Sequence, residues 1–398
     1  MPKKILLLTH VFPPYVFPES YLITKKLGNL KDCEIDVITM EAFFPWVTRD
    51  LEFEALATKD FSNIQRLKPP TWYKYLPFSK LEVLFSLPDA YLYLLPLYVR
   101  KIKTMSLDNY DIVVTWSMYH SVHLLGPLLK KKYPALRWIA HFSDPWSDNP
   151  FFTHGRFVKF INEKLESYVF KGADKIVFTS LSTLENFTKK YSFWKNKAHY
   201  IAHCFVEKLY PKKINKNKIY TIRYLGSFYK SRSPKPFIDG LIAINKDDPE
   251  FLNPSKIRIE FIGSSEFNID DLLGDLPPGL LMQRSSISYI ESLRLMKESD
   301  LLLVIDAPFE NSPFLPSKIV DYFGAEKVIF GVGAAGVTRS VLENAGFLVA
   351  SPDNPEEIAE KFKQSIASCP IKLDSEYDNQ RRMFAQTRIQ KEFLDLCI

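Results

Sequence analysis

The feature that most constrains the fold of this chain is a regular alternation of short apolar runs and longer amphipathic stretches. Alternating strands and helices build parallel sheets, because each helix returns the chain to the starting end of the sheet. Amphipathic stretches predict helices over residues 19–30, 121–132, 157–170, 287–298 and 355–368. Eleven apolar runs predict strands: Lys4–Thr9, Ile35–Thr39, Ile112–Trp116, Trp138–His141, Lys175–Thr179, His199–Ala202, Thr221–Leu225, Arg258–Ile262, Leu301–Ile305, Val328–Gly331 and Phe347–Ala350.

Eleven strands exceed one doubly wound sheet, so the sequence predicts two domains. A polar, cationic segment without apolar periodicity, residues 210–218, is typical of a linker. We therefore expect an α/β fold with two Rossmann-like doubly wound domains, residues 1–208 and 209–377, facing each other across a cleft. Residues 378–398 should form a terminal helix that packs back on the first domain. Ligands of such sheets bind beyond the carboxyl ends of the strands, so residues that follow strands are the functional candidates.

Composition excludes several classes of protein. The 398 residues are 46% hydrophobic and 25% charged, as in ordinary globular proteins. The four cysteines lie far apart, which argues against a zinc site or a disulfide framework and suits a reducing cytoplasm. The first apolar run is too short for a signal peptide, and no segment approaches the roughly 20 apolar residues of a membrane helix. A net charge of +6 permits anionic partners, but no nucleic-acid-binding motif is present.

Residues 311–322 follow a predicted strand and group a helix start with two charged side chains. Ser317 can cap the helix, Lys318 lies in its first turn, and Asp321 is three residues further on the same face. Lys318 and the helix N-terminus suit phosphate oxygens, and Asp321 suits ribose hydroxyls. This spacing fits a nucleoside diphosphate. It fits an ordinary capped helix with a surface ion pair equally well.

The segment 224–234 follows another strand and carries Arg232, which can bind a phosphate in bidentate fashion, with Lys230 adding charge. A solvated basic loop is the alternative interpretation. The segment Gly331–Gly336 spells GxGxxG, with Asp353 after the next strand, as in NAD-binding oxidoreductases. Its late position and the short helix after it argue against a dinucleotide site, but that function stays an alternative.

In the first half of the chain, four side chains after strands could supply acid–base or hydroxyl-binding groups: His120, His123, His141 and Asp144. A metal site is not predicted from them, because this HxxH spacing matches no zinc pattern. A buried structural role is the commoner alternative for each histidine.

Together these segments resemble the nucleotide-sugar-dependent glycosyltransferases of the GT-B fold, in the retaining "group 1" branch. The resemblance covers essentially the whole chain. It is carried by the first strand and loop (4–14), HL-G and ADFRDPW-like patterns (123–126, 139–146), an AD-IV strand (173–177), a G-S-Y---R-P loop (225–234) and a P-K--EY helix (312–322).

The resemblance implies metal-independent transfer of a sugar from a nucleoside-diphosphate sugar, most commonly a UDP-sugar, with anomeric retention and no other cofactor. Asp144 with His120 or His123 would orient the acceptor, and Arg232 with Lys318 would stabilise the leaving diphosphate. The implied donor-binding residues are Gly226, Ser227, Arg232, Gly263, Phe314, Leu315, Pro316, Ser317, Lys318 and Asp321.

The sequence also departs from the family pattern. The usual arginine of the donor loop is Ser227, and the first of two expected glutamates is Pro313, with Glu310 as a possible substitute. His141 and Ser143 replace the Asp and Arg of DFRDPW, and Pro13-Pro14 replaces a glycine pair. Two alternatives therefore stay open: a nucleotide-sugar 2-epimerase, and a non-catalytic nucleotide-sugar-binding subunit.

Two segments, Phe78–Phe85 and Tyr91–Lys103, combine aromatic and basic residues near Lys68, Lys74 and Lys80. Such surfaces can lie on an anionic membrane leaflet, although helices this apolar are more often core. Many relatives in the resembled family build polysaccharide or lipopolysaccharide on lipid carriers. We therefore expect a cytoplasmic protein, peripheral on the inner membrane face, with a glycan or lipid-linked acceptor and no nucleic acid partner.

Overall fold

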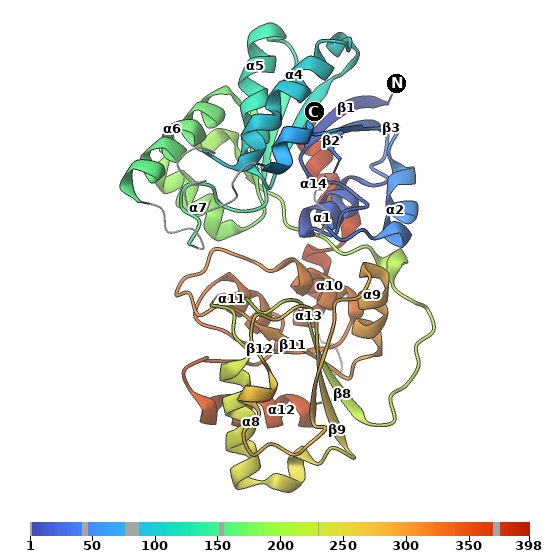
Figure 1. Cartoon of the computed structure of the whole chain (residues 1–398), viewed down its shortest axis with the longest axis vertical. Coiled ribbons are helices and arrows are strands. Elements are labelled where there is room, and N and C mark those ends of the chain that lie inside the picture. Colours follow the sequence, from blue (N-terminus) through green and yellow to red (C-terminus); the bar gives the residue numbers. More distant parts are fainter. Residues whose placement is uncertain (1, 42–46, 76–86, 151–154, 230, 369–374) are drawn as a thin grey trace. The chain divides into compact units, whose positions relative to one another are not determined.

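The structure is a computed structural model that describes residues 2–41, 47–75, 87–150, 155–229, 231–368 and 375–398. The chain divides into two compact units (Figure 1). Unit 1 comprises Met1–His203 together with Ile389–Ile398, and unit 2 comprises Cys204–Arg388. The sequence boundary was expected five residues later, after residue 208.

Unit 1 contains a parallel sheet of seven strands in the order β3-β2-β1-β4-β5-β6-β7. The strands are β1 Lys3–Thr9, β2 Cys33–Met40, β3 Asn63–Leu67, β4 Ile112–Ser117, β5 Arg137–Phe142, β6 Lys175–Phe178 and β7 Ala198–Tyr200. The α-helices are α1 Pro18–Leu27, α2 Leu51–Ala57, α4 Leu95–Ile102, α5 Leu125–Lys132, α6 Arg156–Gly172, α7 Leu181–Lys190 and most of α14 Gln386–Leu396. Short 3-10 helices are η1 Thr58–Asp60, η2 Thr71–Tyr75, η3 Ala90–Leu94, η4 Leu107–Asn109, η5 His120–Leu124 and η6 Ser192–Lys197.

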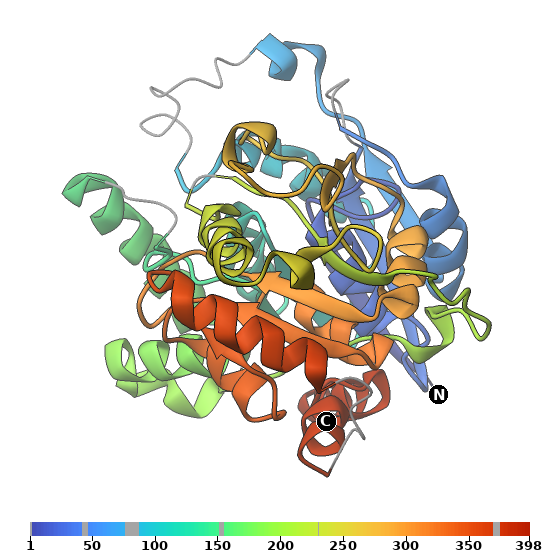
Figure 2. The same ribbon diagram turned by 90° about the horizontal axis from the view of Figure 1, so that it is seen from below.

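Unit 2 contains a parallel sheet of six strands in the order β10-β9-β8-β11-β12-β13. The strands are β8 Tyr220–Leu225, β9 Ile257–Ile262, β10 Leu281–Arg284, β11 Leu301–Ile305, β12 Val328–Val332 and β13 Val349–Ala350. The helices are α8 Lys235–Asp247, α9 Tyr289–Glu298, α10 Ser317–Ala325, α11 Val337–Glu343, α12 Pro355–Ala367 and α13 Ser375–Met383, with 3-10 helices η7 Glu207–Leu209, η8 Pro249–Leu252 and η9 Asp270–Leu272. Helices α8 and α12 lie side by side (Figure 2).

The two sheets confirm the predicted α/β class with two doubly wound parallel sheets. All eleven predicted strands are present, with ends shifted by up to two residues. Two strands were not predicted, β3 and β10, and each lies at the edge of its sheet. An edge strand has fewer neighbours to bury it, so Asn63 and Gln283 remain exposed and the apolar run that marks a buried strand is missing.

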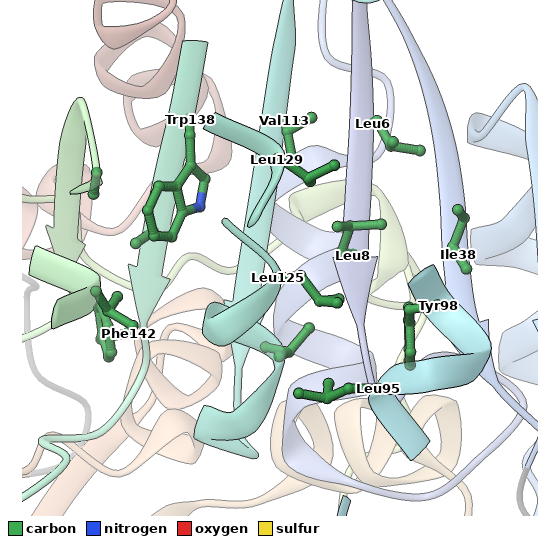
Figure 3. Packing of buried hydrophobic residues seen from close by; sticks show 14 of the residues in the cluster. Leu6, Leu8, Ile38, Leu95, Tyr98, Val113, Leu125, Leu129, Trp138 and Phe142 are labelled. Atoms are coloured by element: carbon green, nitrogen blue, oxygen red, sulfur yellow. The ribbon is translucent and has the colours of Figure 1, made fainter. Parts of the chain in front are cut away.

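The core of unit 1 lies between its sheet and helices α4 to α7. Leu6 and Leu8 on β1 pack with Val113 on β4 and with Leu125 and Leu129 on α5 (Figure 3). The intervening residues of β1 are also fully buried. Both faces of the sheet are therefore covered, as a parallel sheet requires.

The segment after residue 375 forms two helices, α13 and α14, where the sequence predicted one. The break falls at Phe384, which is 1% exposed and packs against Phe323 of unit 2. Helix α14 then belongs mainly to unit 1, where the side chain of Gln390 donates to the carbonyl oxygens of Lys26 and Gly28.

The expected membrane-facing segment Tyr91–Lys103 is largely interior. Its residues Leu94, Leu95, Tyr98 and Ile102 are at most 8% exposed and belong to the core of unit 1. The apolar face of this segment therefore packs in the core, which argues against membrane contact through that face, and peripheral membrane contact of the protein stays a prediction. The other expected segment, Phe78–Phe85, lies outside the described residues. Within the described ranges, no helix has the length and apolar content needed to cross a membrane.

Replacing Gly126 by alanine should destabilise the protein. A Cβ here would lie 2.0 Å from the ring of Trp138, which is buried and donates from Nε1 to Thr115 Oγ1. Overpacking of this kind costs about 1–3 kcal/mol, and we expect the upper end in urea unfolding. Gly155→Ala is the control: no described residue lies within 4 Å of its added Cβ, so the loss should stay below about 1 kcal/mol. Equal losses would contradict the packing argument.

Candidate active site

The strand order of unit 2 reverses between β8 and β11, which is where doubly wound sheets bind ligands. The loop after β8 carries Gly226 and Arg232, and the loop after β11 begins with Asp306. Except for Gly263, which follows β9, the residues predicted to bind the donor thus come after the two strands that flank this switch point.

Two glycines bring the loops after β8 and β9 into direct backbone contact. Gly226 and Gly263 have φ angles of 149° and 144°, a region that side-chain-bearing residues rarely adopt. A Cβ added at Gly263 would lie 2.1 Å from the carbonyl oxygen of Gly226. Gly263 also lines a cavity of about 330 Å³ together with Gln283 and Ser285. The cavity therefore adjoins the loop after β8.

Lys318 on α10 places its amino group beside the same loop. A Cβ added at Gly226 would lie 3.3 Å from Nζ. Nζ lies 3.4 Å from the ring centroid of Tyr224, is buried, and has no hydrogen-bond partner among the described residues. Burial, and after it the charge of Arg232, lower the pKa of Lys318 well below its usual value. A bound anion would supply the partner that Nζ lacks, and the predicted alternative of a surface ion pair is not formed.

Arg232 is held by a carboxylate that the sequence analysis did not single out. Its Nη2 lies 3.3 Å from Oδ1 of Asp306, and Oδ2 of Asp306 accepts a 2.6 Å hydrogen bond from Thr338. Both partners of the ion pair are largely buried, and Nε of Arg232 has no hydrogen-bond partner among the described residues. Asp306 thus pairs with Arg232, whereas Nζ of Lys318 makes no hydrogen bond with it. The other predicted cation of this loop, Lys230, lies outside the described residues.

Helix α10 begins at Ser317 itself, so the prediction that Ser317 caps the helix is wrong. Pro316 holds the cap position with extended backbone (ψ 129°), and no side chain caps the helix. The first N–H groups of a helix lack intrahelical partners, so those of Ser317 and Lys318 are available to a ligand. Phe314 and Leu315 lead into this turn, and the N–H of Phe314 donates to a serine oxygen, Oγ of Ser312, at 3.4 Å.

Asp321 and Lys318 have different neighbours, although they are three residues apart. Asp321 is 4% exposed, and its Oδ1 accepts a hydrogen bond from Tyr289 at 3.0 Å. The contact of Asp321 with a ribose stays a prediction. Ser227, which stands where the family has an arginine, accepts a hydrogen bond at Oγ from a neighbouring serine at 2.8 Å. Glu310, the suggested substitute for the first glutamate, is exposed.

The GxGxxG pattern has a packing explanation. Gly336 has a φ of 154°, and a Cβ there would lie 2.9 Å from the backbone nitrogen of Ser312. The next N–H, that of Val337, donates to the carbonyl oxygen of Ser312. Helix α11, which follows, has only seven residues. Gly336 therefore supports the loop that leads into α10, and this geometry does not favour a dinucleotide site.

In unit 1, His120 and His123 lie in aromatic surroundings. His123 is completely buried, with Nδ1 2.8 Å from Thr115 Oγ1 and its ring 4.1 Å from that of Phe142. The ring of His120 stacks on Trp146 at 5.0 Å, and burial lowers the pKa of His120 to about 3. Both histidines are therefore neutral at physiological pH, which favours packing over acid–base roles.

His141, the third candidate, is also interior. Its ring stacks on Trp116 with centroids 3.4 Å apart, and Nε2 lies 3.0 Å from Nζ of Lys26. Burial lowers the pKa of His141 well below its usual value. Among the residues that the structure describes, no group of three His, Cys, Asp or Glu side chains is arranged to hold a metal ion.

Asp144 lies next to a second carboxyl group that the sequence analysis missed. Glu19, in the first turn of α1, is 2% exposed, and its Oε2 accepts hydrogen bonds from Trp116 Nε1 (2.7 Å) and Ser143 Oγ (2.8 Å). Thr179 fixes the carbonyl of Ser143 at 2.7 Å. The half-buried carboxylate of Asp144 makes no hydrogen bond with any described residue.

The two carboxyl groups titrate apart. Burial, and after it the charge of Asp144, raises the pKa of Glu19 to about 8, whereas burial raises that of Asp144 to about 6. At neutral pH Glu19 therefore holds a proton and Asp144 is ionised. One group can donate to a hydroxyl and the other can accept from one.

Two doubly wound parallel sheets in one chain are the architecture expected of the GT-B fold. No family model matches this sequence, and no curated protein matches it either. Solved structures are similar over nearly the whole chain. HepE of Anabaena has a TM-score of 0.65 at 14% identity, covering 99% of both chains.

Sucrose-phosphate synthase from Thermosynechococcus elongatus has a TM-score of 0.64 at 15% identity, covering 99% of this chain and 98% of that one. The trehalose-6-phosphate synthase OtsA has a TM-score of 0.69 at 12% identity, covering 99% of both. At these identities the likeness shows the fold, and the chain has the GT-B fold that the sequence predicted.

Ionisation of Glu19 should be visible at Trp116. In ¹⁵N-labelled protein, the indole N–H resonance of Trp116 should titrate with a midpoint near pH 8. It should not titrate in Glu19→Gln, and Trp116→Phe assigns the signal. Because the native state keeps a proton that the unfolded chain releases, the wild type should lose stability relative to Glu19→Gln between about pH 5 and pH 8. A flat wild-type titration would contradict the assignment.

Proposed function

We propose that the protein transfers a sugar from a nucleoside-diphosphate sugar, a UDP-sugar by preference, to an acceptor hydroxyl with retention at the anomeric carbon. The observation that carries this proposal is the buried Nζ of Lys318, which lies beside Gly226 at the switch point of unit 2. This Nζ has no hydrogen-bond partner among the described residues. A buried amine without a partner is costly, and a phosphate oxygen is its natural partner.

The diphosphate is assigned to Lys318, Arg232 and the first N–H groups of α10. The cavity beside Gly263 adjoins the loop after β8 and would take the nucleoside. On binding the diphosphate, Lys318 would be favoured in its protonated form, because an adjacent anion stabilises the cation. The paired Asp306 keeps the guanidinium of Arg232 in place for the same phosphates.

Stabilisation of the leaving diphosphate is the main catalytic contribution in this proposal. As the bond from the anomeric carbon to the phosphate oxygen breaks, negative charge develops on the diphosphate. Cations and N–H groups that are already in place stabilise that charge without reorganisation. These side chains and backbone N–H groups supply the stabilisation, so the proposal requires no metal ion.

The acceptor hydroxyl is assigned to Asp144 in unit 1. An ionised carboxylate without a hydrogen bond to the described residues can accept the proton of an attacking hydroxyl. Glu19 fixes Ser143, the residue before Asp144, through a 2.8 Å hydrogen bond. The buried histidines are left out of this step.

The comparisons support the donor class. The HepE structures are described as complexes with UDP and with UDP and glucose, and the proteins of similar fold include synthases of sugar phosphates. The acceptor is proposed to be a cell-surface glycan or a lipid-linked sugar. The protein would then work in the cytoplasm, in peripheral contact with the inner membrane face.

Lys318→Met should weaken UDP binding about tenfold or more, because it removes a charge-assisted hydrogen bond at nearly constant volume. Isothermal titration measures this loss, and Arg232→Met should behave alike. Lys235→Met is the matched control, since Lys235 is an exposed lysine of unit 2 that pairs with Asp239. Unchanged UDP affinity in Lys318→Met, or no binding of any nucleoside diphosphate by the wild type, would remove the proposal.

Asp144→Asn should leave UDP affinity unchanged and lower the rate of sugar transfer by a factor of about 100 or more. The amide keeps the size of the carboxyl group but accepts a proton poorly. Transfer is measured by UDP release with a pool of glycan and lipid-linked acceptors. Loss of UDP binding in Asp144→Asn would show that donor and acceptor roles have been assigned to the wrong units.

The two alternative functions are separated by incubation with UDP-GlcNAc alone. An epimerase would produce the 2-epimer without an acceptor. A non-catalytic binding subunit would bind UDP but release none from any sugar donor.

A further inference from the structure

The outward face of α6 carries an unusual set of side chains. Phe157, Phe160 and Tyr168 are 65%, 53% and 54% exposed. With Lys164 they are spaced by three or four residues, so they form one stripe along the helix. Helix α6 (green) lies at the periphery of its unit in Figure 1. The exposed residues of α6 are Arg156, Phe157, Lys159, Phe160, Lys164, Tyr168 and Lys171, and we call this set the α6 face.

The α6 face is basic and contains no acidic residue, because both glutamates of the helix are used elsewhere. Glu163 pairs with Lys190 at 3.1 Å, and Glu166 is buried and accepts from Ser147 and Tyr191 at 2.6 and 2.7 Å. Four cations therefore remain beside three aromatic rings.

The cations stay close to the rings and open to solvent. Nζ of Lys164 lies 5.2 Å from the ring centroid of Phe160, and Lys159 has only a loose ion pair with Asp148 at 3.5 Å. A soluble helix ordinarily presents polar residues on its outward face. Exposed aromatic rings in a row indicate that this face is covered by a partner.

We infer that the α6 face binds the surface of an anionic lipid bilayer. Aromatic rings insert at the level of the lipid headgroups, and lysine and arginine side chains beside them contact phosphate groups. The absence of acidic residues from the α6 face matches a partner that is negatively charged throughout. The inference rests on the proposed function for its biological setting. Lipid binding is measured without sugar transfer, so the lipid-binding inference and the proposed function can be disproved separately.

The test is co-sedimentation of the full-length protein with vesicles of phosphatidylglycerol and phosphatidylcholine in equal parts. Vesicles of phosphatidylcholine alone are the comparison. The wild type should bind the anionic vesicles, and added salt should weaken binding because salt screens the cations. The double variants Phe157→Ser with Phe160→Ser, and Lys164→Glu with Lys171→Glu, should each reduce the partition coefficient about tenfold or more.

Helices α2 and α5 offer matched controls in the same unit. Lys131→Glu with Lys132→Glu changes the net charge by the same amount at two exposed lysines. Leu51→Ser with Leu128→Ser removes two exposed apolar side chains elsewhere in unit 1. Both control variants should bind vesicles like the wild type. Thermal unfolding of every variant checks that the fold is retained.

Four outcomes would overturn the inference. Two concern the wild type: no binding to anionic vesicles, or equal binding to neutral vesicles. Two concern the variants: a loss of vesicle binding in the control variants as large as in the α6 variants, or full binding by both α6 variants. Analytical ultracentrifugation without lipid tests whether a second copy of the chain, rather than a membrane, binds the α6 face. Self-association that is lost in the Phe157→Ser, Phe160→Ser variant would assign the face to a second copy of the chain and would also overturn the inference.

Discussion

The parallel direction of the strands is the constraint on which the rest of this structure depends. Parallel strands need crossover helices and have both faces buried, and all their carboxyl ends meet at one edge of the sheet. In unit 2, that edge gathers Gly226, Gly263 and Asp306 from three strands that are far apart in the sequence. In unit 1, it gathers Trp116 and Ser143 around the carboxyl group of Glu19. Both sets of functional candidates are consequences of the same topology.

The amino group of Lys318 is buried in unit 2 and makes no hydrogen bond with the described residues, which costs stability. The amino group is no longer hydrated, and the cation–π contact with the ring of Tyr224 offsets only part of the free-energy cost of this desolvation. Arg232 adds a like charge nearby, and the single carboxylate of Asp306 is already engaged by Thr338. The lack of a hydrogen-bond partner for Lys318 among the described residues is the observation on which the proposed donor site rests.

The interior strands could be predicted because each is a continuous apolar run, whereas the edge strands β3 and β10 carry exposed polar residues, Asn63 and Gln283, within the strand. Lys318 and Arg232 were singled out because they lie in the segments that follow β11 and β8, and their roles stay predictions. Glu19 was missed because its importance depends on Trp116 and Ser143, which lie about a hundred residues away. Asp306 follows β11 directly and could have been found by the same rule as Arg232. Acid–base roles were expected for the histidines because the sequence does not show that these particular side chains are buried. Burial lowers their pKa values, which favours packing roles.

The position of α14 has a consequence for how the protein is made. Residues 389–398 complete unit 1, with Ile389 and Phe393 buried and Gln390 bonded to the end of α1, yet all of unit 2 precedes them in the chain. During synthesis from the N-terminus, unit 2 leaves the ribosome whole before the first unit has its full core. Unit 1, which begins the chain, is thus completed after unit 2. Until residues 389–398 are synthesised, part of the α1 surface of unit 1 stays uncovered.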